Sequence, residues 1–98
     1  MFVKFKNGAK KKCTNPIEQK LFRSGNAAGW LCSFSISETV TSTELDELLT
    51  AENISKLTFC NDNSEEIFAI NEYNKVTSAV IRYTEDNSTV EVQFSKGL

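Results

Sequence analysis

The sequence predicts a small α+β domain, built mainly of antiparallel strands with one short helix near residues 42–50. Apolar and polar residues alternate with a period of two over most of the chain, which is typical of half-buried strands. Short turns rich in Asn, Gly, Asp and Ser separate these runs, and strands joined by short turns pair antiparallel. Six to seven strands of this kind predict a curved sheet or a small, partly open barrel, with the helix over one opening.

The length and composition predict a single domain over residues 1–98. A chain of this length buries roughly 60–70% of the surface of its unfolded form, which is enough for one core. No apolar run approaches the ~20 residues needed to span a bilayer. The lysine-interrupted start, Met1–Lys6, lacks the apolar centre of a signal peptide. We therefore expect a cytoplasmic protein, or a virion protein assembled in the cytoplasm, with no membrane partner.

The first predicted element is a basic β-hairpin over residues 1–14. Asn7-Gly8 separates the extended runs Met1–Lys6 and Ala9–Thr14, and this dipeptide is typical of a type I′ hairpin turn. The returning strand is rich in lysine, and lysines protect the edge of a sheet against unwanted pairing. We expect this strand to lie at an exposed edge.

The next predicted strand covers residues 29–37 and belongs to the core. Between it and the hairpin, residues 16–23 are compatible with either a helical turn or an extended strand, and residues 24–29 form a loop of small residues. Large apolar side chains alternate with serines in the strand, which places them on one buried face. These side chains are Trp30, Cys32, Phe34 and Ile36.

The predicted helix over residues 42–50 follows this strand. Thr41 and Glu44 have the spacing of a capping box, in which each side chain binds the other residue's backbone amide. Leu45, Leu48 and Leu49 form an apolar stripe at helical spacing. This stripe predicts that the helix packs against the sheet.

Residues 56–96 are predicted to form an antiparallel meander of four strands, with turns at 61–64, 72–74 and 85–88. Adjacent strands in a meander pair with their neighbours in sequence. The core expected from all elements together comprises Val3, Phe5, Trp30, Cys32, Phe34, Ile36, Leu45, Leu48, Leu57, Phe59, Phe68, Ile70, Val80, Val90, Val92 and Phe94.

The charges are sorted along the chain. Residues 1–23 carry a net charge of +6, whereas residues 24–98 carry −8. Such asymmetry bears on association with partners rather than on the fold. The basic segment is therefore the candidate interaction surface, through Lys4, Lys6, Lys10, Lys11, Lys12, Lys20 and Arg23.

The residue types argue against an enzyme. The chain has no histidine, which is the commonest general base and metal ligand. Cys13, Cys32 and Cys60 match no zinc-site spacing, and we interpret them as buried small hydrophobes. Of these, Cys13 beside the lysines is the one candidate for a lowered thiol pKa. We expect no catalytic residue, no cofactor, no metal and no small-molecule substrate.

These features favour a non-enzymatic assembly or adaptor protein that acts through protein–protein contacts. A basic end and an acidic remainder are complementary, so a homo-oligomer with head-to-tail contacts is expected. The small size and a composition rich in Asn, Lys, Ser and Thr suggest a bacteriophage or prophage structural component of the tail or head-completion type. Two alternatives remain open: nucleic-acid binding through the basic hairpin, and inhibition of a basic host protein by the acidic surface.

Overall fold

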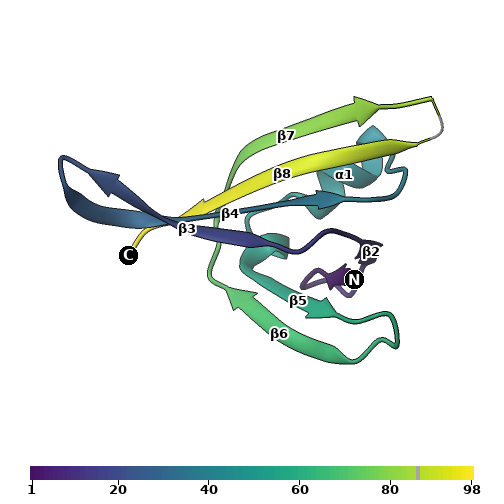
Figure 1. Ribbon diagram of the computed structural model, residues 1–98, viewed down its shortest axis with the longest axis horizontal. Coiled ribbons are helices and arrows are strands. Elements are labelled where there is room, and N and C mark those ends of the chain that lie inside the picture. Colours follow the sequence, from purple (N-terminus) through teal and green to yellow (C-terminus); the bar gives the residue numbers. More distant parts are fainter. Residues whose placement is uncertain (86) are drawn as a thin grey trace.

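The computed structural model describes residues 1–85 and 87–98, and over these residues it confirms the predicted class (Figure 1). Two four-stranded antiparallel sheets are present, ordered β2-β1-β5-β6 and β3-β4-β8-β7, with one short α-helix. Asp86, in the turn expected at residues 85–88, lies outside the described residues. The elements are β1 (Phe2–Lys4), β2 (Lys10–Lys12), β3 (Ile17–Arg23), β4 (Asn26–Ile36), α1 (Ser42–Leu48), the 3₁₀ helix η1 (Asn53–Ser55), β5 (Lys56–Cys60), β6 (Glu66–Asn71), β7 (Lys75–Tyr83) and β8 (Ser88–Lys96).

The described part of the chain has eight strands, compared with the six to seven predicted. The additional strand is β3, in the segment for which the sequence allowed either a helical turn or a strand. It pairs along β4, from Ile17 opposite Ser33 to Arg23 opposite Asn26. The turn between them is Ser24-Gly25, whose φ angles of 51° and 80° are both positive. Two consecutive positive φ angles are characteristic of the type I′ turn. Residues 17–23 are therefore extended.

The predicted type I′ turn at Asn7-Gly8 is wrong, although the hairpin itself forms. Phe5 donates its amide to the carbonyl of Ala9 and accepts from the amide of Gly8, both at 2.9 Å. These bonds enclose a three-residue loop, with the left-handed φ of 91° at Gly8. Asn7 instead folds its side-chain oxygen onto the amide of Ala9, at 2.9 Å. This Asx-type bond favours the longer loop.

The predicted continuous meander over residues 56–96 is also wrong, because its two halves belong to different sheets. Strand β5 pairs with β1 and β6, whereas β8 pairs with β4 and β7. Between the halves, Tyr73 is fully buried and donates its hydroxyl to Glu18 on β3 at 2.8 Å. The chain crosses from one sheet to the other at this buried ring, so β6 and β7 do not form a hairpin.

The core lies between the two sheets. The ring of Phe34 on β4 contacts Phe59 of the opposite sheet edge-on, with centroids 5.4 Å apart, and Phe94 on β8 at 5.8 Å. Trp30 and Leu45 are only partly buried against this core. The other predicted core residues found buried are Val3, Phe5, Cys32, Phe34, Ile36, Leu48, Leu57, Phe59, Ile70, Val90, Val92 and Phe94.

Two predicted core residues are wrong. Phe68 and Val80 expose 39% and 43% of their surface. Phe68 lies on the edge strand β6 and is covered on one side, where it stacks on Phe59 with ring centroids 5.0 Å apart. Val80 lies on the edge strand β7, opposite the exposed Glu91. The period of two does not tell an edge strand from a central one.

The sheets meet along one side and remain apart on the other. Past β2, Cys13 pairs with Ile36 at the end of β4, and Thr14 donates its amide to the carbonyl of Ser35 at 2.9 Å. On the opposite side, β6 and β7 are both sheet edges. This arrangement matches the predicted partly open barrel.

Helix α1 begins as predicted but ends earlier than residue 50. The hydroxyl oxygen of Thr41 accepts the amide of Glu44 at 3.1 Å, which caps the helix. The carboxylate of Glu44 is held by Lys11 rather than completing the capping box. Leu48 is buried, and Leu45 and Leu49 pack against the core. No helix among the described residues is long and apolar enough to cross a membrane.

Candidate interaction surface

The seven basic residues of the predicted surface fall into two groups that the structure separates. Five lie on the hairpin β1–β2, which belongs to one sheet. Lys20 and Arg23 lie on β3, at the edge of the other sheet. The five hairpin residues are Lys4, Lys6, Lys10, Lys11 and Lys12.

Acidic residues from distant segments neutralise part of the hairpin group. The Lys4 ammonium lies 3.4 Å from the Glu66 carboxylate on β6, and Lys6 lies 3.9 Å from Glu52. Lys10 donates to a neutral partner, the Ser64 hydroxyl, at 2.6 Å. These exposed pairs stabilise the fold only slightly. They nevertheless reduce the positive charge that the hairpin offers to a partner.

Lys11 is the most enclosed of the hairpin lysines. It lies opposite Val3, and its side chain is only 16% exposed. Its ammonium donates to both carboxylate oxygens of Glu44 at 2.9 Å and lies 3.3 Å from Glu38. Hydrogen bonding to Glu44 raises the pKa of Lys11 above its ordinary value, against the opposing effect of burial. This lysine joins the hairpin to the start of α1 and is not available to a partner.

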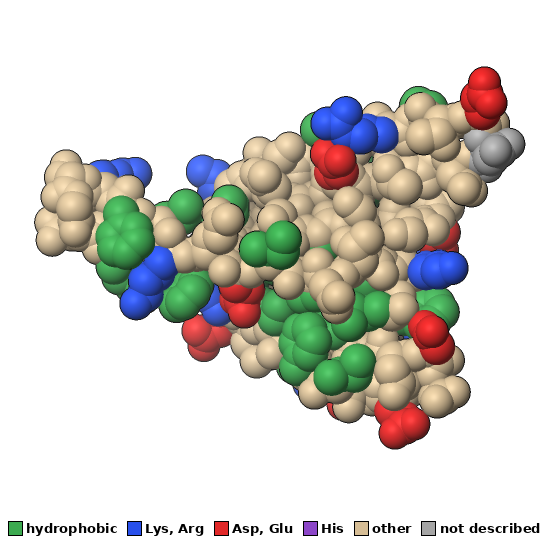
Figure 2. Space-filling view, in the orientation of Figure 1, with side chains coloured by type: hydrophobic (Ala, Val, Ile, Leu, Met, Phe, Trp, Pro, Cys, Tyr) green, Lys and Arg blue, Asp and Glu red, His purple; other side chains and the backbone are tan. Residues whose placement is uncertain are grey.

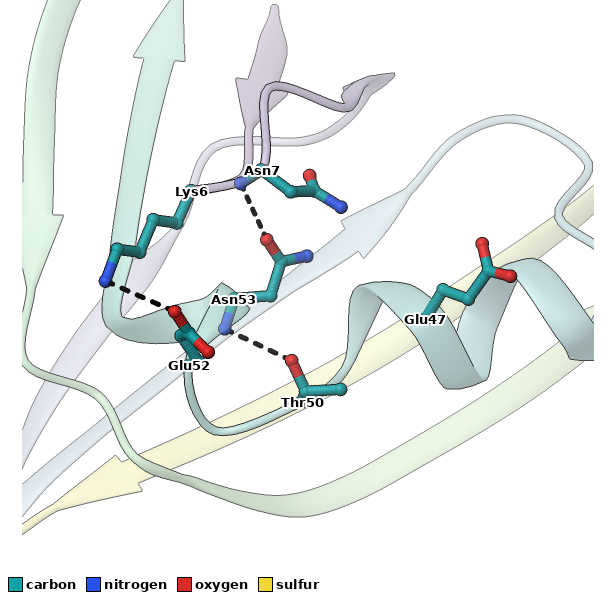
Figure 3. A pocket seen from close by; sticks show the side chains of 6 residues that line it. All are labelled: Lys6, Asn7, Glu47, Thr50, Glu52 and Asn53. Carbon is teal, nitrogen blue, oxygen red and sulfur yellow. Dashed lines mark hydrogen bonds and ion pairs between the residues drawn. The ribbon is translucent and has the colours of Figure 1, made fainter.

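A polar pocket of about 350 Å³ lies between the hairpin loop and the end of α1 (Figure 3). Asn53 lies at its centre, with its side-chain NH₂ donating to the Leu48 carbonyl at 2.9 Å. Its side-chain oxygen accepts the Asn7 amide at 2.8 Å. Lys6 and Glu52 face each other at the rim. These polar groups bind one another, which makes the pocket a structural junction.

The hypothesis of a lowered pKa at Cys13 is wrong. All three cysteines are buried, as predicted, and unpaired. Burial raises the pKa of the Cys13 thiol to about 11 and that of Cys32 to about 12. Both thiols are therefore protonated and unreactive at neutral pH. Within the described residues, no group of three or more His, Cys, Asp or Glu side chains could hold a metal ion.

The second basic group lies on a projecting hairpin, which we call the arm and define as residues 17–29. Its tip projects beyond the rest of the molecule (Figure 1), and the whole molecule, arm included, measures 43 × 29 × 21 Å. All seven residues of β3 are exposed. Ile17, Leu21 and Phe22 expose 59%, 37% and 65% of their surface. Figure 2 shows hydrophobic and basic side chains next to one another on the arm.

Local sequence explains how the arm is held at its base. A Cβ atom on Gly29 would collide with the backbone carbonyl oxygen of Lys96, so glycine is needed where β4 passes the end of β8. The arm and this end of β8 border an open groove of about 400 Å³. Its lining includes Leu21 and Phe22 together with three cations, Arg23, Lys75 and Lys96, and no carboxylate.

The sequence named Lys20 and Arg23 as surface residues but missed the exposure of their apolar neighbours. In the sequence, Ile17, Leu21 and Phe22 are compatible with one apolar side of a short helical turn or strand. The signal that could have found them is their spacing, which fits neither a buried strand nor a long amphipathic helix. Apolar residues whose spacing matches neither a strand nor a helix are candidates for an exposed contact surface.

Comparison with known proteins gives no relative from which to assign a function. No protein-family model matches the chain, and neither the curated proteins nor the solved structures include a significant match.

Proposed function

We propose that this chain is a non-enzymatic assembly or adaptor protein and that the arm is its contact surface. The observation that carries this proposal is the exposure of Ile17, Leu21 and Phe22 on a projecting hairpin. Exposed apolar groups gathered in one place are typical of protein–protein contact sites. Aromatic residues and arginine contribute most to such contacts, and the arm carries one of each, Phe22 and Arg23, near its tip.

The composition favours one setting for this function, a structural component of a bacteriophage or prophage particle. In that setting, many copies of a small protein contact one another or a larger neighbour. A homo-oligomer is the expected state because the arm carries cations and most of the remaining chain is acidic. Of the basic surface predicted from the sequence, we retain Lys20 and Arg23 as the contact residues.

A second candidate function is binding of single-stranded nucleic acid at the base of the arm. The groove there combines Arg23, Lys75 and Lys96 with the exposed ring of Phe22, and no carboxylate lines it. Cations beside an aromatic platform are typical of sites that bind single strands. The acidic remainder of the chain and the pI of about 5.1 oppose binding of a long polyanion. We therefore rank this candidate second.

Light scattering after gel filtration tests the assembly proposal. At low salt we expect a mass above the 11.0 kDa of one chain, rising with concentration and falling at high salt. Phe22→Ser should return the protein to a monomer. Tyr83→Ser is the matched control, because Tyr83 is also an exposed aromatic residue of an edge strand, and it should behave like the wild type.

A wild-type chain that stays monomeric at every concentration and salt would contradict assembly through the arm. Fluorescence anisotropy with a labelled single-stranded oligonucleotide then tests the second candidate. Binding that is lost in Arg23→Glu would support it.

A further inference from the structure

Each sheet has two edge strands, and their charges differ in sign. An edge strand presents unpaired backbone N–H and C=O groups that can pair with another strand. The edges are β2, β3, β6 and β7. Three of them carry more basic than acidic residues: β2 is three lysines, β3 has Lys20 and Arg23 against Glu18, and β7 has Lys75 and Arg82.

Strand β6 is the acidic edge. It begins at Glu66, is flanked by Glu65 and Glu72, and no Lys or Arg occurs between residues 61 and 74. It is also apolar and exposed, because Ile67 is 52% exposed and Phe68 is 39% exposed. A group of hydrophobic side chains is visible over β5 and β6 in Figure 2. This edge therefore has the same kinds of group as the arm, with the opposite charge.

We propose that the arm of one copy adds as an extra strand to the β6 edge of a second copy. The proposal rests on the proposed function and names the partner of the same contact surface. Among the edges of the described chain, β6 is the one whose charge is opposite to that of the arm. Arm against arm, or arm against β7, places cations beside cations, and β6 against β6 places glutamates beside glutamates. Like charges directly opposite each other destabilise paired strands.

The two strands are regular where they would meet. The bulge in the β3–β4 pair adds its extra residue, Ala28, on β4, so β3 itself keeps the strict alternation that a new partner needs. The bulge in the β5–β6 pair lies at Ile67, and β6 is regular from Phe68 to Asn71. An antiparallel pairing along this regular part brings the end of the arm, with Arg23, to Glu65 and Glu66. The facing pairs are Leu21–Phe68, Lys20–Ala69, Gln19–Ile70 and Glu18–Asn71.

The contact is head-to-tail. The tip of the arm projects away from β6 (Figure 1), and the two strands belong to different sheets, so they do not pair within a single copy. A contact between two different surfaces leaves one arm and one β6 edge free in every dimer. Such contacts continue into rings or filaments. The expected assembly is therefore larger than a dimer at high concentration.

Disulfide trapping tests the pairing. Lys20→Cys and Ala69→Cys are purified separately, mixed and mildly oxidised, because directly facing residues lie close enough for a disulfide. The native thiols do not interfere, since all three are buried. We expect a covalent dimer of about 22 kDa, twice the chain mass, in the mixture and in neither variant alone.

Ala79→Cys is the matched control for Ala69→Cys, because Ala79 is also an exposed alanine on an edge strand, β7. Its mixture with Lys20→Cys should give at least about tenfold less covalent dimer. Equal trapping at Ala79, or efficient trapping of Lys20→Cys alone, would overturn the proposal in favour of β7 or of a symmetric arm–arm contact.

The two proposals fail in different ways. If the wild type associates and Phe22→Ser does not, while the Ala69→Cys mixture traps no more than the Ala79→Cys mixture, the arm remains the contact surface and β6 is not its partner. If the wild type is monomeric in light scattering, the proposed function fails as well.

Discussion

The molecule has two N-terminal hairpins that are both antiparallel but differ in almost every other respect. Strands β1 and β2 have three residues each, yet Val3 in β1 and Phe5, directly after β1, are almost completely buried. Strands β3 and β4 are much longer, with seven and eleven residues, yet β3 is exposed throughout. The short hairpin is part of the body, and the long one projects from it. Strand length therefore does not indicate how firmly a hairpin belongs to the fold.

The two hairpins also differ in how their basic side chains are paired. Lysines of the short hairpin meet glutamates that lie far away in the sequence, as Lys4 meets Glu66 and Lys11 meets Glu44. Lys20 on the long hairpin contacts an aromatic ring instead, 5.5 Å from the centroid of Trp30. Within the run Lys10-Lys11-Lys12, the middle lysine therefore has a structural role, whereas its two neighbours are exposed. The two separate cations on the arm are the better candidates for contact with a partner.

The largest expected difference between the hairpins is in the packing of their phenylalanines. Phe5 is 2% exposed and Phe22 is 65% exposed. We expect Phe5→Ala to lower the free energy of unfolding by about 3–5 kcal/mol through lost burial and a residual cavity. Phe22→Ala should change it by less than about 0.5 kcal/mol. Urea denaturation of a dilute, monomeric sample measures both values, and equal effects would contradict the division into body and arm.

The second, smaller difference is between two asparagines: Asn53, which binds the loop of the short hairpin, and Asn26, which lies beside the turn of the arm. Asn53→Ala removes the two side-chain hydrogen bonds of Asn53, and it leaves the Leu48 carbonyl and the Asn7 amide without that partner. We expect a loss of about 2–3 kcal/mol in the free energy of unfolding. Asn26→Ala, beside the turn of the arm, should cost less than about 0.5 kcal/mol. Thermal denaturation followed by circular dichroism distinguishes the two, and a stable Asn53→Ala variant would show that the junction is dispensable.

The sequence predicted those parts of the fold that depend on local pattern. The core face of β4, the start of α1 at Thr41 and the first hairpin all follow from spacing within a dozen residues. The position of each strand in its sheet depends on distant partners and was missed. Burial of Tyr73 separates β6 from β7, and nothing in the residues next to it marks that ring as a core residue.

The candidate surface was predicted only in part, for the same reason. Net charge identified the first 23 residues as one basic segment, but pairing depends on where Glu38, Glu44, Glu52 and Glu66 fold. Local charge therefore could not separate the ion-paired lysines, Lys4, Lys6 and Lys11, from the other basic residues. The exposure of Phe22 likewise depends on the whole arm projecting beyond the other strands.

The smallest expected contrast is between two lysines and has a defined dependence on pH. Lys11→Met removes the ion pairs with Glu38 and Glu44 and should cost about 1 kcal/mol, because the side chain is mostly enclosed. Lys20→Met removes an exposed cation and should cost less than about 0.5 kcal/mol. Both are measured by urea denaturation at fixed ionic strength between pH 7 and 11.

The sign of the pH effect follows from the direction of the pKa shift. Hydrogen bonding to Glu44 raises the pKa of Lys11 above its unfolded value of 10.5. The contribution of Lys11 to stability is therefore complete below that value and is lost as the pH rises through the folded pKa. The difference between the wild type and Lys11→Met should be constant near neutral pH and shrink at the alkaline end. If the difference in the free energy of unfolding between the wild type and Lys11→Met instead grew with pH, the ammonium of Lys11 would not be stabilised by these carboxylates. The proposed contrast between an ion-paired short hairpin and an unpaired arm would then fail.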